Sequence, residues 1–327
     1  MGRLSDGRWQ GGDQLQIGAQ GWEPRQELLR GSIKAKADDN SRPAVAGRYH
    51  LIDCPGCPLS HRVSIAFHMK GLGSAISRAQ VLPVMGENGR ELFISDGEKS
   101  DVHTGARYLY ELYQATDAAY TGRASTPVLW DKHDRKIVSN SYDEIFGIVN
   151  SEFNAFAARD FDFRPPEVVD QLQAELAWLG AGFTGAVYRC GFALDQSTYD
   201  TYAAAIARTV PLIEEKLSSH RYLLGDRVTE ADLALLVTLL RYDAIYAPLF
   251  KCTSQRIADW PAICAYVSHM LSLPGVADTF DLSRSMAHYF VSHAHLNPKR
   301  IIPAAPAQPW FEAPQEARSA GEEVLIR

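Results

Sequence analysis

The sequence predicts two folded units, an α/β unit over residues 46–160 and an all-helical unit over 161–305. Strand-like alternation of apolar and polar residues is confined to the first of these ranges, and long helical patterns fill the second. The run Arg164-Pro165-Pro166 separates the two kinds of pattern. A chain of 327 residues is long enough for two domains. We expect an irregular N-terminal arm over 1–45 and an extended, proline-containing tail over 306–327.

The α/β unit is predicted to follow the order β-α-β-α-β-β-α. Each assignment follows from apolar residues spaced at a period of two for strands or 3.6 for helices. The expected strands are 49–52, 76–84, 128–131 and 136–138, and the expected helices are 63–69, 101–114 and 143–153. Helix 101–114 takes its apolar face from Tyr108, Leu109, Leu112 and Tyr113. Thr104 is available near the start of that helix.

The second unit is predicted to be a set of packed helices. The expected helices are 168–179, 199–217, 230–246 and 257–271. Thr229 followed by Asp232 has the spacing of a capping box, so the third of these helices is expected to begin there. Small residues such as Ala203, Ala204 and Ala205 favour close approach of neighbouring helices. The sequence shows no internal repeat.

A cysteine pair follows the first predicted strand. The chain reads Cys54-Pro55-Gly56-Cys57-Pro58 and then enters the first predicted helix. Unpaired N–H groups and partial positive charge at a helix N-terminus favour thiolate over thiol. Proline costs a helix little in its first turn, where no N–H bond is made. Because the thiolate is the nucleophilic form of cysteine, this turn predicts thiol chemistry.

A proline before the third predicted strand supports the same interpretation. The chain reads Ser125-Thr126-Pro127-Val128 at that point. Cis X–Pro bonds are uncommon in general. However, thioredoxin-like folds present a reactive cysteine at a strand-to-helix turn and keep a cis-proline beside it. We therefore predict a thioredoxin-like α/β unit with a cis bond before Pro127.

Composition and charge exclude several classes of function. The net charge is −6 without runs of like charge, so a nucleic-acid backbone is not an expected partner. Five scattered cysteines are an odd number and do not indicate a secreted disulfide framework. Residues 1–20 lack the apolar segment of a signal peptide, and the apolar stretch 233–240 is too short to span a bilayer. We expect a cytoplasmic protein without a membrane partner.

Other candidate sites are weaker. Cys190, Cys252 and Cys264 lie among apolar and aromatic residues, as buried structural cysteines do. The spacings of the tail histidines match no zinc pattern, so no metal is expected and tail packing explains them better. The side chains considered for this metal site are His288, His293, His295 and Asp281.

Many dispersed motifs point to one family. In the α/β region they are Tyr49-His50-Leu51, His61-Arg62, Pro127 to Lys132, Ile137-Val138-Ser139-Asn140 and Asn150-Ser151-Glu152-Phe153. In the helical region they are Val187 to Ala193, Arg221 to Asp226, Arg241 to Tyr246, Phe250-Lys251-Cys252, His288-Tyr289, Ser292-His293, Asn297-Pro298 and Ile301-Ile302-Pro303. Over about residues 45–305 the chain resembles the Xi-class glutathione transferases, the glutathionyl-hydroquinone reductases. The resemblance implies a thioredoxin-like domain followed by an all-α domain, the glutathione transferase fold.

The resemblance also implies which residues react. Family members carry Cys-Pro-Trp-Ala-His-Arg at the reactive turn, and counting from Arg48 places Cys57 in register with that cysteine. Leu59 and Ser60 then replace the Trp and Ala. Cys54 is an additional thiol, a candidate resolving thiol at dithiol spacing from Cys57.

The reaction that the resemblance implies is reductive cleavage of a thioether between a small thiol and a hydroquinone. Cys57 attacks the sulfur, a mixed disulfide forms, and a second thiol molecule releases the enzyme. Tyr188 and Tyr289 match the family's active-site tyrosines, whose hydroxyls stabilise developing charge. The implied substrate is a small aromatic quinol thioether, the co-substrate is a low-molecular-weight thiol, and we expect a homodimer.

The predicted thiol-binding residues depart from the family pattern. Where family members have a Glu-Ser pair for the γ-glutamyl group, this chain has Ser141-Tyr142, and Arg90 stands where a Trp is usual. Tyr110 replaces an expected arginine. Loss of a charged partner of a buried ionic group is costly, so glutathione is expected to bind poorly. The residues expected to bind the thiol are Arg90, Thr126, Pro127, Val128, Ser141 and Tyr142.

Two explanations of this departure stay open. One is a thiol that lacks the γ-glutamyl group, such as the sugar-based mycothiol of many actinobacteria, and we favour it. The other is internal resolution by the Cys54/Cys57 pair. Two alternative functions also remain, a dithiol disulfide or dehydroascorbate-type reductase that uses both cysteines, and a non-enzymatic protein that binds aromatic ligands.

Overall fold

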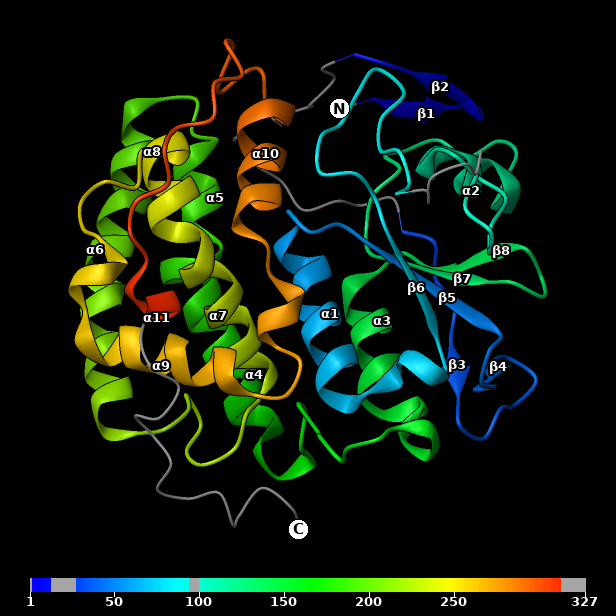
Figure 1. The fold of residues 1–327 in the computed structure, drawn as a ribbon, viewed down its shortest axis with the longest axis horizontal. Coiled ribbons are helices and arrows are strands. Elements are labelled where there is room, and N and C mark those ends of the chain that lie inside the picture. Colours follow the sequence, from blue (N-terminus) through cyan, green and yellow to red (C-terminus); the bar gives the residue numbers. More distant parts are fainter. Residues whose placement is uncertain (1, 13–27, 94–99, 313–327) are drawn as a thin grey trace. The chain divides into compact units, whose positions relative to one another are not determined.

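The computed structural model describes residues 2–12, 28–93 and 100–312, which divide into two compact units (Figure 1). Unit 1 contains the described parts of Met1–Gln16, Pro24–Arg159 and Thr279–Ile302. Unit 2 contains Asp160–Asp278 and the described part of Pro303–Arg327. Thr279–Ile302 therefore belongs to unit 1 although it follows most of unit 2 in the chain.

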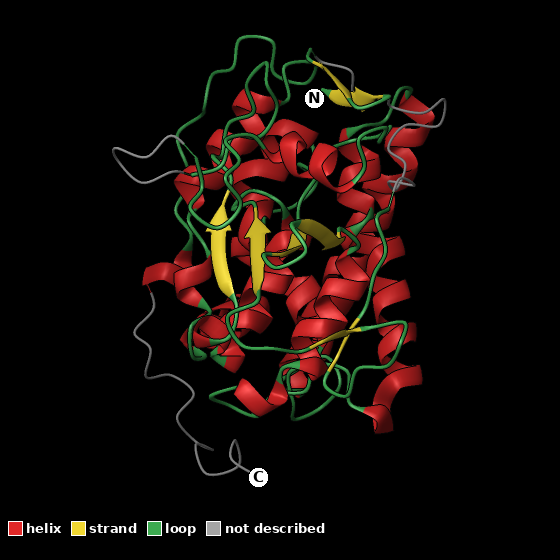
Figure 2. Cartoon of the chain, turned by 90° about the vertical axis from the view of Figure 1, so that its right-hand side faces the viewer, coloured by secondary structure: helices red, strands yellow, loops and turns green. Residues whose placement is uncertain are grey.

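Unit 1 is built on a four-stranded mixed sheet. Its strands are β5 (Tyr49–Asp53), β6 (Ser77–Gln80), β7 (Val128–Asp131) and β8 (Lys136–Ser139). The strand order is β6-β5-β7-β8, with β5 and β6 parallel and the other two pairings antiparallel. Figure 2 shows these strands in yellow and the short strand pairs apart from them. The predicted thioredoxin-like unit is confirmed.

Helices cover this sheet because side chains alternate between its two faces. The helices are α1 (Pro58–Lys70), α2 (Leu109–Thr116) and α3 (Tyr142–Gly147), followed by a π-helical turn at Ile148–Glu152. Ile52, Val128 and Trp130 form one apolar cluster with Leu109 and Leu112 of α2. Helices α1 and α3 pack against each other, and α2 packs against β8 (Figure 1). The loop that carries the two cysteines lies between β5 and α1.

The prediction of a helix over 101–114 is wrong for the first half of that range. The carboxylate of Asp101 accepts hydrogen bonds from the N–H groups of His103 (3.1 Å) and Thr104 (2.8 Å), which closes a turn. Gly105 follows at φ +74°, outside helical geometry. Helix α2 begins only at Leu109, where the carboxylate of Glu111 accepts from the N–H of Tyr108 (3.2 Å). Thr104 is thus not the cap.

The N-terminal segment contains short strands that its sequence did not predict. Strands β1 (Arg3–Ser5) and β2 (Arg8–Gln10) form an antiparallel pair, and β3 (Ile33–Lys34) and β4 (Arg42–Pro43) form a parallel pair. Leu4 is fully buried and exchanges backbone hydrogen bonds with Gly122. The described part of the arm is therefore attached to unit 1.

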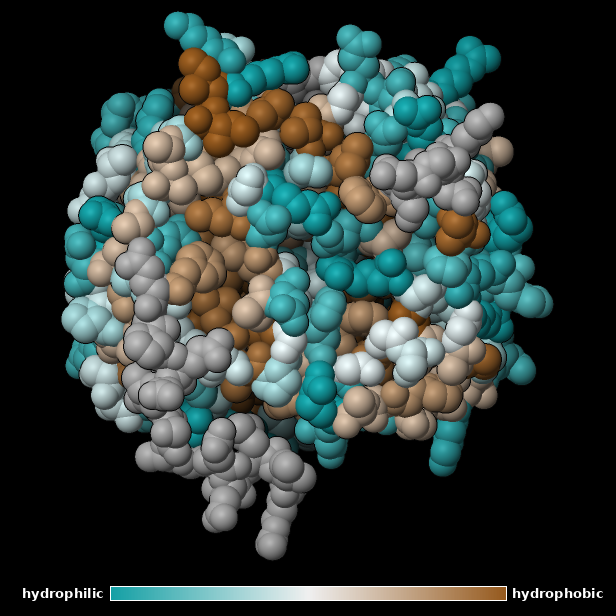
Figure 3. Space-filling model, in the orientation of Figure 1, coloured by the Kyte–Doolittle hydropathy of each residue, from teal (hydrophilic) through white to brown (hydrophobic). Residues whose placement is uncertain are grey.

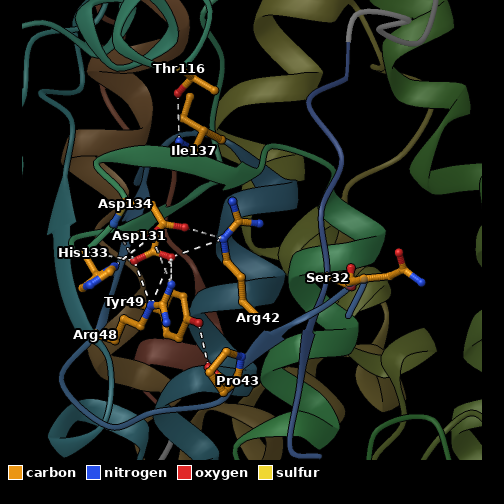
Figure 4. A network of polar contacts seen from close by, with 11 residues as sticks. Ser32, Arg42, Pro43, Arg48, Tyr49, Thr116, Asp131, His133, Asp134 and Ile137 are labelled. Carbon is orange, nitrogen blue, oxygen red and sulfur yellow. Dashed lines mark hydrogen bonds and ion pairs between the residues drawn. The ribbon is translucent and has the colours of Figure 1, made fainter. Parts of the chain in front are cut away.

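A buried carboxylate fixes the turn between β7 and β8 (Figure 4). Asp131 has no exposed surface and accepts hydrogen bonds from Nη2 (2.6 Å) and Nε (3.0 Å) of Arg48. Arg42 lies 3.3 Å from the same carboxylate, and the N–H of His133 donates to it. A buried charge with several donors is held in one position. This network anchors the end of β7 opposite Val128.

The regular secondary structure among the described residues of unit 2 is helical, apart from an isolated β-bridge between Tyr222 and Gly225. Its helices are α4 (Val169–Leu179), α5 (Ala186–Gly191), α6 (Gln196–Ser219), α7 (Glu230–Arg241), α8 (Ala247–Phe250), α9 (Pro261–Ser272) and α11 (Pro309–Glu312). π-Helical turns occur at Gly180–Thr184 and Tyr242–Tyr246. The predicted capping box is present, since the carboxylate of Asp232 accepts from the N–H of Thr229 (2.8 Å). The rest of the predicted tail beyond 312 lies outside the described residues.

One continuous helical segment among the described residues, Glu230–Phe250, is long and apolar enough to cross a membrane. Most of it is buried inside the protein, as a core helix is. Figure 3 shows that hydrophobic residues also gather at the surface among hydrophilic ones. The most exposed large apolar side chains are those of Val102, Ile301, Phe93 and Leu194.

Candidate active site

The cysteine turn joins the end of β5 to the start of α1. Cys57 is the N-cap residue of α1, with extended backbone (φ −77°, ψ 120°), and Pro58 opens the helix. The N–H of Cys57 donates to the carbonyl of Cys54 (3.1 Å), and the carbonyl of Cys57 accepts from the N–H of His61 (2.9 Å). The sulfur of Cys57 is thus attached to the residue that begins a helix, where backbone N–H groups favour negative charge.

The two thiols of the turn differ in burial and charge. Cys54 is 1% exposed, whereas Cys57 is half-buried. Burial raises the pKa of the Cys54 thiol, and the positive charge of Arg90 partly opposes this effect. Arg90 donates from Nη1 to Sγ of Cys54 across 3.0 Å. The more exposed thiol at the helix start is therefore the better placed nucleophile.

The bond between Thr126 and Pro127 is cis, as predicted. Ile52 of β5 pairs with Val128 of β7 in antiparallel register. Continuing this register by two residues places the Thr126-Pro127 segment opposite Cys54, beside the cysteine turn. Oγ1 of Thr126 is buried and has no hydrogen-bond partner within the described part of the chain. A buried hydroxyl of this kind is a candidate for binding the small thiol.

Helix α10 (Leu282–Ser292) packs onto the cysteine turn within unit 1. Oγ of Ser285 donates to the carbonyl of Pro55 (3.2 Å). A Cβ atom built on Gly56 would lie 2.2 Å from Cγ of His288, so only glycine allows this approach. The ring Nδ1 of His288 lies 2.9 Å from the carbonyl oxygen of Pro83. The structure thus brings a distant segment over the predicted reactive turn.

Tyr289 lies on this same helix. It is 2% exposed, and its ring stacks on that of His293 with centroids 5.5 Å apart. His293 also hydrogen-bonds through Nδ1 to the carbonyl of Tyr289 (3.0 Å). Burial lowers the pKa of His293 to about 4, with smaller contributions from the positive charges of His295 and Arg90. The helix therefore brings the predicted tyrosine to the region of the cysteine turn.

Tyr188 lies on α5 in unit 2. Its hydroxyl is 3.3 Å from that of Tyr246, and its ring lies 5.5 Å from the ring of Phe250. Tyr188 and Cys57 belong to different units, so the predicted joint role of these two residues stays a prediction.

The predicted thiol-binding pair starts α3. Ser141 is the N-cap residue, and its N–H donates to Oγ of Ser139 (3.0 Å). The guanidinium of Arg62 lies 5.6 Å from the ring centroid of Tyr142. Glu144, in the first turn of α3, accepts from the hydroxyl of Ser139 (2.7 Å). Position 141, the first of the two residues predicted to bind the thiol, therefore holds a hydroxyl and no carboxylate.

The tail residues considered for a metal make other contacts. Asp281 caps α10, accepting from the N–H of Arg284 (2.9 Å). No group of three or more potential metal ligands occurs within the described ranges. His288 and His293 instead contact backbone carbonyls.

Two features of the site were not predicted. The hydrogen bond from Arg90 to Cys54 joins a loop residue to the end of β5, and no local sequence pattern encodes it. The packing of Ser285 and His288 on the cysteine turn was also missed. The sequence offers one indication of this packing, the family motif at His288-Tyr289. The motif shows that the segment matters but does not show what the segment contacts.

The chain is similar to proteins of known families. Residues 172–274 match the family model described as "Glutathione S-transferase, C-terminal domain". The chain is 39% identical over 311 residues to the glutathionyl-hydroquinone reductase PcpF of Sphingobium chlorophenolicum, covering 94% of this chain and 97% of that protein.

Solved structures agree with this similarity. The glutathione-bound structure of YqjG, a glutathione transferase homolog from Escherichia coli K-12, has a TM-score of 0.84 at 33% identity, covering 96% of this chain and 98% of that one. The Xi-class glutathione transferase from Natrialba magadii has a TM-score of 0.86 at 32% identity, covering 96% and 95% of the two chains.

Proposed function

The chain belongs to the Xi-class glutathione transferases, the family of the glutathionyl-hydroquinone reductases, and from that premise we propose that it reductively cleaves thioether conjugates of hydroquinones. The co-substrate is a low-molecular-weight thiol, and no metal takes part. The single observation that carries the proposal is the position of Cys57, a half-buried thiol at the N-cap of α1 beside the cis-proline segment.

The proposed chemistry is thiol exchange at a carbon-bound sulfur. The thiolate of Cys57 attacks the thioether sulfur, an S–S bond forms, and the C–S bond breaks. The electron pair of that bond stays with the ring carbon, which takes a proton, and the hydroquinone leaves. A second thiol molecule then attacks the mixed disulfide and releases Cys57 with a free disulfide. The aromatic carbon is reduced, and the thiol moiety of the conjugate and one free thiol molecule end as one disulfide.

Tyrosine hydroxyls are proposed to assist carbon–sulfur cleavage. The substrate is best attacked as its keto tautomer, so negative charge develops on a ring oxygen. Tyr289 lies on the helix that packs on the cysteine turn, which supports a role as donor to that oxygen. Tyr188 is proposed as a second donor because of its match to the family motif.

The small thiol is proposed to lack a γ-glutamyl group, as mycothiol does. Ser141 provides no charge for an α-ammonium group, and the ring of Tyr142 is occupied by the guanidinium of Arg62. The guanidinium of Arg90 is bonded to Cys54. Glutathione is therefore expected to bind with a dissociation constant in the millimolar range or weaker, equivalent to about 4 kcal/mol or less.

Turnover and binding test these two parts separately. Hydroquinone release from glutathionyl- and mycothiol-hydroquinone conjugates is measured by chromatography for wild type, Cys57→Ala and Cys54→Ala. We expect no release by Cys57→Ala and largely unchanged release by Cys54→Ala. The reverse result would remove Cys57 as the nucleophile.

Thiol preference is measured by calorimetric titration of Cys57→Ser protein with glutathione and with mycothiol. Mycothiol should bind more tightly. The double variant Ser141→Glu, Tyr142→Ser should recover glutathione affinity, whereas the uncharged control Ser141→Gln, Tyr142→Ser should not. Micromolar glutathione binding by the unaltered residues at 141 and 142 would contradict the altered thiol preference.

A second candidate function is a dithiol reductase that uses both cysteines of the turn. The hydrogen bond from Arg90 to Cys54 favours it, because this cation partly offsets the rise in the pKa of the Cys54 thiol that burial causes. Here Cys54→Ala would abolish reduction of a small disulfide or of dehydroascorbate. Retention of that activity by Cys54→Ala would leave the thioether reaction as the function.

A further inference from the structure

Two cysteines of unit 2 lie together although they are far apart in the chain. Cys190 is in α5, and Cys252 follows Lys251, the residue that ends α8. Both are free and 2% exposed. The Sγ atoms of Cys190 and Cys252 lie 3.8 Å and 3.9 Å from one acceptor, the carbonyl oxygen of Phe250. The two thiols also contact each other.

The backbone around the pair is built for close approach. A Cβ atom on Gly191 would lie 2.2 Å from Cγ of Phe250, so glycine is required where α5 meets this segment. Lys251 adopts left-handed backbone (φ +60°), which turns the chain directly after Phe250. The hydroxyl of Tyr199 donates to the carbonyl of Lys251 (2.7 Å) and holds this turn. The two sulfurs are thus held side by side by the fold.

A surface pocket reaches Cys190. It has a volume of about 260 Å³ and is lined by Cys190, Leu194, Asp195, Tyr199 and Lys251 among others. A molecule as small as a peroxide or water fits easily in this volume. A small reagent in this pocket would therefore lie beside Cys190.

The surroundings distinguish the two thiols. A hydrogen bond from Cys252 lowers the pKa of Cys190, and the charge of Lys251 adds to this effect. The same hydrogen bond, together with burial, raises the pKa of Cys252. The first thiolate of the pair is therefore at Cys190, the member that lines the pocket.

We propose that Cys190 and Cys252 form a peroxide-sensitive dithiol that closes to an intramolecular disulfide. The Cys190 thiolate attacks hydrogen peroxide, an S–O bond forms, the O–O bond breaks, and hydroxide leaves as water after taking a proton. Cys252 then attacks the Cys190 sulfur, an S–S bond forms, the S–O bond breaks, and a second water leaves. Two thiols are oxidised, and one peroxide is reduced to two waters.

The disulfide would join α5 to the end of α8 around Phe250. The ring of Tyr188 contacts that of Phe250, with centroids 5.5 Å apart, so oxidation changes the surroundings of Tyr188. This modification site does not depend on the proposed activity, because it uses neither cysteine of the turn in unit 1.

Tryptic mapping tests the proposal in the full chain. Cleavage after Arg189 and Lys251 places the two cysteines on separate peptides, 190–208 and 252–256. The remaining cysteines fall on 49–62 and 257–284, so every pairing gives a distinct product. After stoichiometric peroxide and alkylation, we expect the linked pair 190–208 and 252–256, lighter by two hydrogens and separated again by dithiothreitol.

Variants complete the test. Cys190→Ser and Cys252→Ser should each abolish the linked product, and Cys252→Ser should carry sulfinic acid at Cys190. The matched control Cys264→Ser should retain the link, and Lys251→Gln should slow its formation several-fold. Oxidation of the 49–62 peptide in the wild-type protein shows that the peroxide has reacted. If Cys190 and Cys252 are recovered alkylated from that same sample, the proposal is overturned without any variant.

Discussion

Arg90 donates a hydrogen bond from Nη1 to Sγ of Cys54 across 3.0 Å. Cys54 is buried, and burial raises the pKa of its thiol. The positive charge of Arg90 opposes this rise in part, so the pKa of Cys54 is raised less than burial alone would raise it. Two thiols of one turn therefore have separate surroundings, Cys54 beside a charged side chain and Cys57 at a helix start. We therefore expect the two cysteines to differ in reactivity.

Arg90→Gln should therefore suppress the reactivity of Cys54. Removing the cation raises the pKa of Cys54, so its alkylation should slow several-fold at neutral pH and recover only at higher pH. The measurement is the pH dependence of iodoacetamide labelling on peptide 49–62 in Cys57→Ser protein. Arg107→Gln is the control, because Arg107 pairs with Glu91 and does not contact Cys54. Equal labelling of the Arg90 variant and the parent would mean that the hydrogen bond has no effect on Cys54.

Tyr289→Phe and Tyr188→Phe should each lower the rate of hydroquinone release by about 10-fold or more, the scale of one hydrogen bond to developing charge. Folding stability should change little, since each variant loses only a hydroxyl. Tyr120→Phe is a suitable control, because the Tyr120 hydroxyl lies 3.5 Å from the carbonyl of Arg123 and has no proposed role in the reaction. Steady-state turnover and urea unfolding are measured together. Wild-type rates in both variants would exclude these tyrosines from the mechanism.

Gly56→Ala should destabilise unit 1 and reduce turnover. The new methyl group would lie within 2.4 Å of three atoms of His288, including its Cβ, so α10 must move away from the cysteine turn. Overpacking of this kind costs about 1–3 kcal/mol. Gly73→Ala is the matched control, since no atom lies within 4 Å of a Cβ at that position. Denaturant titration gives the stability, and equal stability of the two variants would contradict the close approach of Gly56 and His288.

Local patterns in the sequence predicted the elements that depend on neighbouring residues. The strand at Tyr49–Asp53, the helix that follows Pro58 and the capping box at Thr229 are all present. The cis bond before Pro127 is also present. It could be predicted because the order of the elements places this proline beside the cysteine turn. These features were predictable since hydrophobic period, proline and capping residues act over a few positions.

Features that depend on distant contacts were not predictable. Helix α10 has an ordinary helical pattern, and only its contacts with Pro55 and Gly56 show that it belongs to unit 1. Cys190 and Cys252 were each interpreted as isolated buried residues, because nothing local reveals that they share the Phe250 carbonyl. Burial of both was predicted correctly, and their proximity was not.

Stability should rise with pH between about 4 and 6.5 because of buried histidines. Burial lowers the pKa of His293 to about 4 from an ordinary value of 6.5, and it lowers that of His50 to about 4 as well. Between these values the unfolded chain binds more protons than the folded chain, so acid favours unfolding. The contribution of the two neutral histidines to the free energy of unfolding is fully present above pH 6.5. It is lost on acidification, by up to about 3 kcal/mol for each histidine.

His293→Gln should therefore weaken the pH dependence of unfolding. The variant removes one of the two described histidines whose pKa is lowered by burial, so the slope of the free energy of unfolding against pH should fall. Urea titrations from about pH 4.5 to 7.5 measure that slope. His220→Gln, at an exposed position that ends α6, controls for the loss of a histidine as such. An unchanged slope in His293→Gln would mean that His293 binds its proton equally in the folded and unfolded chain.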